Sequence, residues 1–210
     1  MIRVLIADDH PVVRAGVRQI VSTAGDITVA AEAATGHEVI AQVRGTPLDL
    51  VVLDLSMSDG DGLDVLKQIK REHPGVRVIV LTMHSEHQFA IRALKAGAAG
   101  YVTKDSAPAE LVTAIRHVMD GGRYVTLGLA EKLAAHIGRE GEQVPHEELS
   151  DREYQVLRLI AAGRSTREIA DQLSLSMKTI STYRSRILEK MQMRNVAELT
   201  AYVVRNRLAD

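Results

Sequence analysis

The sequence predicts an α/β domain with a doubly wound parallel sheet, followed by a small all-α domain. In residues 1–105, five short apolar runs alternate with segments of helical periodicity, which is typical of β/α units joined by right-handed crossovers. From residue 149 onward only helical periodicity remains. We therefore expect a three-layer N-terminal domain and a C-terminal group of short helices.

The apolar runs predict five parallel strands. The third and fourth runs are apolar at nearly every position, which indicates central strands buried on both faces. The expected strands are Ile2–Ala7, Ile27–Ala33, Leu48–Asp54, Val76–Thr82 and Ala98–Val102. The expected helices cover residues 11–24, 35–44, 60–72, 86–96 and 107–120, within a domain spanning 1–121. Pro11 and Pro108 fit first turns, and Ser85 with Gln88 resembles a capping box.

The segment 122–148 predicts a linker that contains a helical stretch near Leu127–Arg139. After that stretch the chain is acidic and broken by Gly and Pro, as linkers often are. The second domain is expected over 149–210. Its helices are predicted at 151–162, 166–173, 177–191 and 195–207, with capping boxes at Ser150–Glu153 and Ser165–Glu168.

Composition excludes several classes of site. The 210 residues are 46% apolar and 25% charged, as in globular proteins. No apolar run approaches the roughly 18 residues of a membrane span, and the first apolar run is followed by two acids rather than a cleavage site. The absence of cysteine excludes disulfides, thiolate metal sites and cysteine nucleophiles. We expect a cytoplasmic protein that does not contact membranes.

Charge is distributed unevenly along the chain. Residues 1–121 hold 12 basic and 15 acidic side chains, whereas residues 149–210 hold 11 basic and 7 acidic ones. A basic C-terminal part favours nucleic acid as a partner. An ordinary solvated surface explains the charge equally well, so the motifs must decide between the two interpretations.

Polar side chains follow the predicted strands at the points where they end. Asp8 and Asp9 follow the first strand, Asp54 ends the third, Thr82 ends the fourth, and Lys104 lies just beyond the fifth. Ligands of open α/β sheets bind outside these carboxyl ends, so we expect the five side chains to converge. Each residue alone is more often a helix cap or loop residue. Together, three neighbouring carboxylates predict a bound cation, and Mg²⁺ prefers such oxygen ligands.

The segments Asp8-Asp9, Leu53–Met57 and Gly100–Lys104, together with Thr82, resemble the receiver domain of bacterial two-component response regulators. The resemblance covers residues 1–121 and implies a five-stranded, flavodoxin-like domain. It implies that Asp54 accepts a phosphoryl group from the phosphohistidine of a sensor histidine kinase. It also implies an Mg²⁺ ion held by Asp9, Asp54 and the backbone carbonyl of Ser56, with Asp8 close by.

The same resemblance implies a conformational switch. Lys104 would pair with the phosphoryl oxygens, Thr82 would hydrogen-bond one of them, and Tyr101 would change its rotamer with Thr82. One departure from the family pattern is Ser58, where many receivers have proline. This departure leaves the rate and the lifetime of phosphorylation open.

Alternatives from other classes are weaker. A phosphatase of the haloacid-dehalogenase type needs a second Asp two residues after its nucleophile, and that position is Ser56. A flavodoxin-like cofactor site would place a phosphate where Asp8 and Asp9 repel it. The three histidines His10, His84 and His87 are disfavoured as ligands beside an oxygen-rich site. We therefore expect a protein that is not an enzyme.

Residues 166–191 follow the outline of a helix-turn-helix, whose second helix enters the major groove of DNA. At 100° per residue, apolar side chains from Ile180 to Met191 cluster on one arc of this second helix. The opposite arc carries Lys178, Ser181, Thr182, Ser185 and Arg186. Short hydroxyls and cations suit contacts to phosphates and base edges, although a solvated face has a similar composition.

The segments Leu149–Leu157, Glu168–Ala170, Leu173–Ser176 and Lys178–Ile180, together with Gly163, are similar to the LuxR-type DNA-binding domain. This resemblance spans nearly all of residues 149–210. It implies that Ser181, Thr182 and Ser185 read bases, and that Lys178, Thr179 and Arg186 lie near phosphates.

A receiver joined to a LuxR-type domain resembles response regulators of the NarL/FixJ class, which are phosphorylation-controlled transcription factors on double-stranded DNA. A phosphatase-like enzyme with an accessory helical domain, and a DNA-binding protein with a degenerate receiver, remain the alternatives.

The last predicted helix carries an apolar stripe formed by Val196, Leu199, Thr200 and Val203. The stripe either closes the core of the small domain or pairs two subunits on DNA. Resemblance to LuxR-type domains favours a shared role. We expect the start of the helix to pack inward and Val203 to reach the partner in a homodimer.

Overall fold

The computed structural model describes residues 1–57, 62–83, 87–131, 145–173, 175–206 and 208. The chain forms two compact units, Met1–Gly138 and Arg139–Asp210. Ser58, His84 and Ser85, which the sequence analysis singled out, lie outside the described residues. Within the described residues, every helix is too short or too polar to cross a lipid bilayer.

The first unit contains the predicted doubly wound sheet, and every strand pair in it is parallel. The strand order is β2-β1-β3-β4-β5-β6. The strands are β1 (Ile2–Ala7), β2 (Ile27–Ala33), β3 (Leu50–Leu53), β4 (Arg77–Thr82), β5 (Gly100–Thr103) and β6 (Tyr124–Val125). The four strands β3, β4, β1 and β5 carry almost entirely buried side chains, as expected for central strands.

The sixth strand is a difference from the prediction. Tyr124 pairs with Gly100, and Val125 pairs with Tyr101, at the edge of the sheet. Gly100 permits this close approach, because a Cβ atom there would lie 3.3 Å from the carbonyl oxygen of Tyr124. Leu129 is also buried in the first unit. The start of the predicted linker therefore belongs to the first unit.

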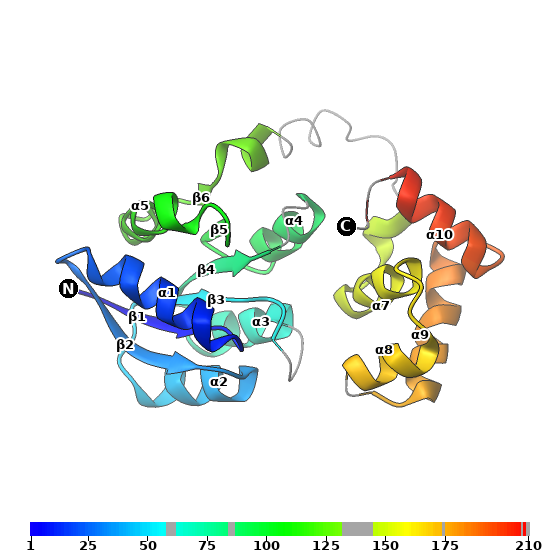
Figure 1. The fold of residues 1–210 in the computed structure, drawn as a ribbon, viewed down its shortest axis with the longest axis horizontal. Helices are drawn as coiled ribbons and strands as arrows, with labels where there is room; N and C mark the ends of the chain where they lie inside the picture. Colours follow the sequence, from blue (N-terminus) through cyan, green and yellow to red (C-terminus); the bar gives the residue numbers. More distant parts are fainter. Residues whose placement is uncertain (58–61, 84–86, 132–144, 174, 207, 209–210) are drawn as a thin grey trace. The chain divides into compact units, whose positions relative to one another are not determined.

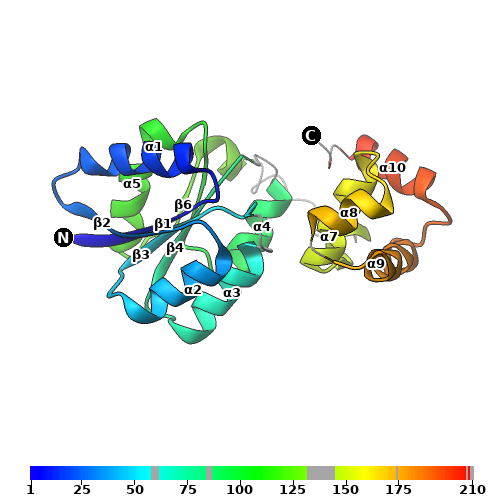
Figure 2. The same ribbon diagram turned by 60° about the horizontal axis from the view of Figure 1, so that its bottom comes forward.

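Helices cover both faces of the sheet (Figures 1 and 2). On one face, α1 and α5 contribute Val17, Val21, Leu111 and Ile115 to a buried cluster. On the other face, buried residues of α2, α3 and α4 form a second cluster. These helices are α1 (Pro11–Ser22), α2 (Gly36–Gly45), α3 (Gly62–Glu72), α4 (His87–Lys95) and α5 (Ala107–Met119).

The second unit is all helical in its described part. It contains the short 3₁₀ helix η1 (Pro145–Glu148) and the helices α7 (Asp151–Ala161), α8 (Thr166–Gln172), α9 (Met177–Lys190) and α10 (Val196–Arg205). Both predicted capping boxes form, at the starts of α7 and α8.

The helical stretch predicted near Leu127–Arg139 begins in the first unit. Residues 127–131 are helical as predicted, and residues 132–139 lie outside the described part of the chain.

Candidate functional site

The register of the sheet brings the acidic residues together. Ala7 of β1 lies opposite Leu53 of β3, so Asp8 and Asp54 leave neighbouring strands at the same level. The backbone amide of Asp54 donates to the carbonyl of Ala7 at 2.9 Å. At the carboxyl ends of β4 and β5, the amide of Lys104 donates to the carbonyl of Thr82 at 2.8 Å. The predicted residues therefore emerge from adjacent strands at one edge.

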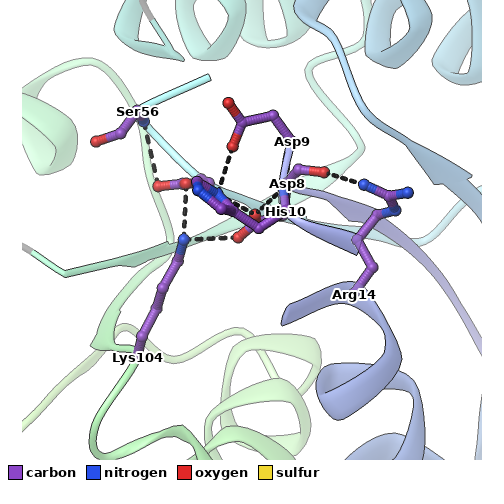
Figure 3. Close-up of polar contacts among 7 residues, drawn as sticks. Asp8, Asp9, His10, Arg14, Ser56 and Lys104 are labelled. Carbon is purple, nitrogen blue, oxygen red and sulfur yellow. Dashed lines mark hydrogen bonds and ion pairs between the residues drawn. The ribbon is translucent and has the colours of Figure 1, made fainter. Parts of the chain in front are cut away.

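Lys104 connects the two buried carboxylates (Figure 3). Its Nζ lies 2.8 Å from Asp54 Oδ2 and 2.7 Å from Asp8 Oδ2. Asp8 and Asp54 are each 1% exposed, and the Lys104 side chain is 12% exposed. In such a desolvated position the ammonium group compensates much of the repulsion between the carboxylates.

Burial and ion pairing oppose each other at these groups. Burial raises the pKa of Asp54, and the hydrogen bond from Lys104 only partly offsets this effect. For Lys104, burial alone would lower the pKa, but its hydrogen bonds to Asp54 and Asp8 are stronger in sum and raise the pKa. Lys104 is therefore held in its charged form at neutral pH.

Asp9 and His10 complete the acidic cluster. One oxygen or nitrogen from each of Asp8, Asp9, His10 and Asp54 lies within 4.8 Å of the others. His10 Nδ1 is 2.7 Å from Asp9 Oδ1, and the His10 amide donates to Asp8 Oδ1 at 2.8 Å. Arg14 donates to the backbone carbonyl of Asp8 at 2.7 Å, which holds the turn after β1.

The donor set fits a hard divalent cation. Asp8 Oδ2 and Asp9 Oδ1 are buried, and the partners described for them are the nitrogens of Lys104 and His10. Carboxylate and backbone carbonyl oxygens are the ligands that Mg²⁺ prefers. The amide of Ser56 donates to Asp54 Oδ1 at 3.1 Å, so the loop after β3 stays close to the cluster.

The two predicted switch residues lie on neighbouring strands. Thr82 is buried at the end of β4, opposite Thr103. Tyr101 is fully buried and belongs to the cluster under α3 and α4. Coupling between Thr82 and Tyr101 remains a prediction.

Gly62 is a residue that the sequence analysis missed. A Cβ atom at this position would collide with the Leu55 Cα and lie 2.8 Å from the carbonyl oxygen of Asp54. The Gly62 amide also donates to the Leu55 carbonyl at 3.1 Å. The first residue of α3 therefore packs directly on the backbone that carries Asp54, and a glycine at a helix start was the available signal.

In the second unit, α9 presents the predicted polar face to solvent. Ile180, Ile187 and Met191 are buried, whereas the residues on the opposite side are exposed. The exposed residues are Lys178, Ser181, Thr182, Ser185 and Arg186, and Thr179 is half-buried. A shallow surface pocket is lined by Lys178, Thr179, Thr182, Tyr183 and Arg186.

A buried carboxylate attaches the end of α9 to the start of α7. Glu153 Oε2 accepts hydrogen bonds from the Ser150 amide at 2.8 Å and from Lys190 Nζ at 2.6 Å. Burial would raise the pKa of Glu153, but these hydrogen bonds hold it below its usual value. The capping box was predicted, whereas the contact with Lys190 could not be, because it joins residues far apart in sequence.

The predicted dimer contact requires a correction. Leu199 and Val203 are fully buried inside the second unit, so their side chains cannot reach a partner subunit. Val196 is half-buried. The adjacent Val204 is 65% exposed, so α10 presents a large apolar side chain outward at that position.

Comparison with known families identifies both units. The profile of the response regulator receiver domain matches residues 4–116. The profile of bacterial regulatory proteins of the luxR family matches residues 147–203.

Curated relatives match along the whole chain. Response regulator UvrY of Escherichia coli K12 is 38% identical over 211 residues, which cover 100% of this chain and 97% of the relative. Response regulator GacA of Pseudomonas aeruginosa is 36% identical over 211 residues, with coverage of 100% and 99%.

Solved structures of RcsB from Salmonella are also similar. One has a TM-score of 0.74 at 30% identity and covers 97% of each chain. Another, bound to the promoter rprA in the presence of the phosphomimetic BeF₃⁻, has a TM-score of 0.69 at 33% identity and covers 97% of this chain and 99% of that one. The chain therefore belongs to the response regulators of the NarL/FixJ class, with a receiver domain followed by a LuxR-type DNA-binding domain.

Proposed function

We propose that this response regulator accepts a phosphoryl group on Asp54 from a sensor histidine kinase and thereby controls its binding to double-stranded DNA. The observation that carries the proposal is the buried group of Asp8, Asp54 and Lys104 at the carboxyl edge of the sheet. Because its proposed partners are a sensor histidine kinase and double-stranded DNA, we propose that the protein acts in the cytoplasm. We assign the receiver to residues 1–121, with the start of the segment 122–148 added to it by strand β6, the linker to the rest of that segment, and the DNA-binding domain to 149–210.

The acidic site supplies what phosphoryl transfer to a carboxylate needs. An oxygen of Asp54 attacks the phosphorus, and the bond between phosphorus and the histidine nitrogen of the kinase breaks. Lys104 then neutralises charge on the transferred oxygens, which is the main requirement in such reactions. Asp9, Asp54 and the carbonyl of Ser56 would hold Mg²⁺, with Asp8 nearby, and the ion would neutralise further phosphoryl charge. Because the product stays on the protein, the reaction is stoichiometric rather than enzymatic.

Phosphorylation changes what Lys104 binds. In the present structure Lys104 pairs with Asp8 and Asp54, and a phosphoryl group would compete for the same ammonium. Thr82 ends the neighbouring strand and would hydrogen-bond a phosphoryl oxygen, while Tyr101 would follow it. This shift in population would alter domain or subunit contacts.

DNA binding is assigned to the exposed face of α9. Ser181, Thr182 and Ser185 would contact base edges, and the phosphate contacts would come from Lys178, Thr179 and Arg186. The structure of RcsB bound to the promoter rprA, which matches 97% of this chain at 33% identity, supports DNA binding, and the residue roles rest on the exposed face of α9. We propose a homodimer in which each recognition helix meets one half-site of the DNA.

Mass spectrometry of the intact protein tests the phosphoacceptor. With acetyl phosphate and Mg²⁺, we expect one phosphoryl group on the wild type and none on Asp54→Asn. Asp9→Ala should label weakly, and Lys104→Ala should label but switch poorly. Asp120→Asn removes an exposed carboxylate at the end of α5 and should label like the wild type. Unchanged labelling of Asp54→Asn would refute the assignment.

DNA occupancy across the genome tests the regulatory role. Wild type and Asp54→Asn are compared at equal protein levels, under conditions that activate the kinase. We expect discrete sites that depend on Asp54. Sites that are bound equally by both proteins would favour a DNA-binding protein with a degenerate receiver.

A further inference from the structure

Met177 is an apolar side chain in an otherwise polar recognition surface. It is the first residue of α9, and it is 58% exposed. Isolated exposed apolar residues are common on proteins, so exposure alone assigns no role. The position is informative, because the N-terminal residues of a recognition helix are those that contact base edges.

The exposed face of α9 is divided into two rows. Met177, Ser181 and Ser185 are four residues apart and form one row along the helix. Ser181 Oγ donates to the Met177 carbonyl at 2.9 Å, and Ser185 Oγ donates to the Ser181 carbonyl at 3.2 Å. This row is therefore neutral, and its hydroxyl protons are used within the helix.

Two cations lie in the adjacent row, where Lys178 and Arg186 line the shallow pocket together with Thr179, Thr182 and Tyr183. A third exposed cation, Arg184, lies on the other flank of the neutral row. Thr182 Oγ1 also donates to its own helix, at the Lys178 carbonyl, 3.0 Å away. A pocket with two cations suits the phosphate backbone, so the base edges are left to the neutral row that begins at Met177 and to Thr182 at the border of the pocket.

The chemistry of the neutral row limits the bases that it can recognise. In the major groove guanine presents only hydrogen-bond acceptors, N7 and O6, which are normally read by Arg or Lys. Serine oxygens whose protons are already donated offer lone pairs, which match the amino groups of adenine and cytosine but not guanine, so the apolar side chain of the row must separate the two base pairs. An A·T pair presents the adenine amino group as a donor and the thymine 5-methyl group as an apolar surface. The flexible thioether of Met177 suits contact with such a methyl group.

We propose that Met177 contacts the 5-methyl group of a thymine in each half-site and is a specificity-determining residue of this regulator. The proposal rests on the DNA-binding function proposed above, and it adds a base and a residue that the resemblance to LuxR-type domains did not supply. Met177 would recognise the methyl group by apolar contact alone, without a hydrogen bond.

Deoxyuridine tests this contact directly, because it differs from thymidine only by the missing methyl group. The preferred site of the full-length protein, phosphorylated with acetyl phosphate and Mg²⁺, is first selected from random double-stranded DNA, and the same phosphorylated protein is used throughout. Each thymine of the half-site is then replaced by deoxyuridine, one at a time, and binding is measured by fluorescence anisotropy. At one position the wild type should bind about fourfold more weakly, which corresponds to one buried methyl group. Replacement in both half-sites should multiply the two losses.

Variants of the same helix give the control. Met177→Ala should bind thymidine and deoxyuridine probes equally, whereas Met177→Leu should keep most of the discrimination. Lys178→Ala should weaken binding to both probes alike and leave their ratio unchanged. Circular dichroism of each variant verifies that α9 remains folded.

The outcomes separate the two proposals. Equal binding of all deoxyuridine probes by the wild type, or a ratio that persists in Met177→Ala, overturns the role of Met177 and leaves DNA binding intact. Failure of the wild type to select any sequence overturns the proposed function itself, and the inference about Met177 with it.

Discussion

The acidic site and the α9 face are built in opposite ways. In the receiver, Asp54 and Lys104 lie 50 residues apart in sequence and meet at 2.8 Å in a buried position. In the DNA-binding domain, the side chains proposed to contact DNA follow one another along a single helix, and Ser185 and Arg186 are exposed. The first site exists only when the sheet forms, whereas the second is a property of one helix face.

This difference determines how substitutions combine. Asp8, Asp54 and Lys104 share ion pairs, so changes at two of these residues should not be additive. Exposed residues that are well separated along α9 share fewer contacts, and their effects should add more nearly. We therefore expect the burial of the substituted residue to determine the loss of stability more strongly than its distance from either site.

The largest effect is expected from a buried position far from either set of functional groups. Val203→Glu places an unpaired carboxylate in the core of the second unit and should destabilise it by about 4 kcal/mol. Thermal unfolding followed by circular dichroism should show loss of the transition of that unit. The exposed neighbour provides the control, because Val204→Glu should leave stability within about 0.5 kcal/mol of the wild type.

The same two variants sharpen the dimer proposal. If α10 pairs two copies on DNA, Val204→Glu should prevent paired half-site binding while the unit stays folded. Analytical ultracentrifugation on a two-site DNA measures this directly. A folded Val204→Glu variant that still binds as a pair would place the contact elsewhere, and a stable Val203→Glu variant would contradict the burial of Val203.

The next largest effect is expected beside the acidic site. Gly62→Ala forces a Cβ atom against the backbone of Asp54 and Leu55 and should cost about 3 kcal/mol of stability. It should also reduce phosphorylation, because the loop that carries Asp54 must move. Gly16→Ala in α1 meets no heavy atom within 4 Å and should be neutral or slightly stabilising. Chemical denaturation of both variants distinguishes a local clash from a general effect of losing glycine.

A smaller and more selective effect is expected on α9. Arg186→Ala should weaken binding to all DNA sequences and reduce the slope of affinity against salt by about one. Ser185→Ala should keep the slope and change base preference, at a cost of about 1–3 kcal/mol on the best site. Titrations over a range of salt concentrations measure both. If Arg186→Ala changed the base preference and left the salt slope unchanged, Arg186 would contact a base rather than a phosphate.

The smallest effect on stability is expected from the ion pair of Arg3 and Asp49, which lies at the edge of the sheet opposite the acidic site. The hydrogen bond from Arg3 lowers the pKa of Asp49 to about 2. A carboxylate with a lowered folded-state pKa stabilises the fold above its unfolded pKa, and this contribution disappears as the pH falls toward 2. Wild type should therefore melt slightly above Asp49→Asn at pH 7, and the two should converge near pH 2. A gap that widened on acidification would contradict this sign.

Much of the fold and of both sites could be predicted from local patterns. Alternating apolar runs located β1 to β5, and the serine and glutamate spacing located the starts of α7 and α8. Since parallel strands share their carboxyl edge, strand assignment alone was enough to bring Asp8, Asp54 and Lys104 together. The exposed residues of α9 followed from helical periodicity, because one buried arc determines which arc faces solvent.

Only the tertiary structure decided features that depend on contacts between distant segments. A stripe through Leu199 and Val203 has the same period whether it faces the unit's own core or a second subunit, and packing placed both residues inside. The two-residue strand β6 is too short for a periodic signal and forms because β5 offers it an edge. Gly62 likewise acquires its role only when α3 is packed on the backbone of Asp54. Periodicity specifies which side of an element is apolar, and the partner that covers that side is chosen by the packing of the whole chain.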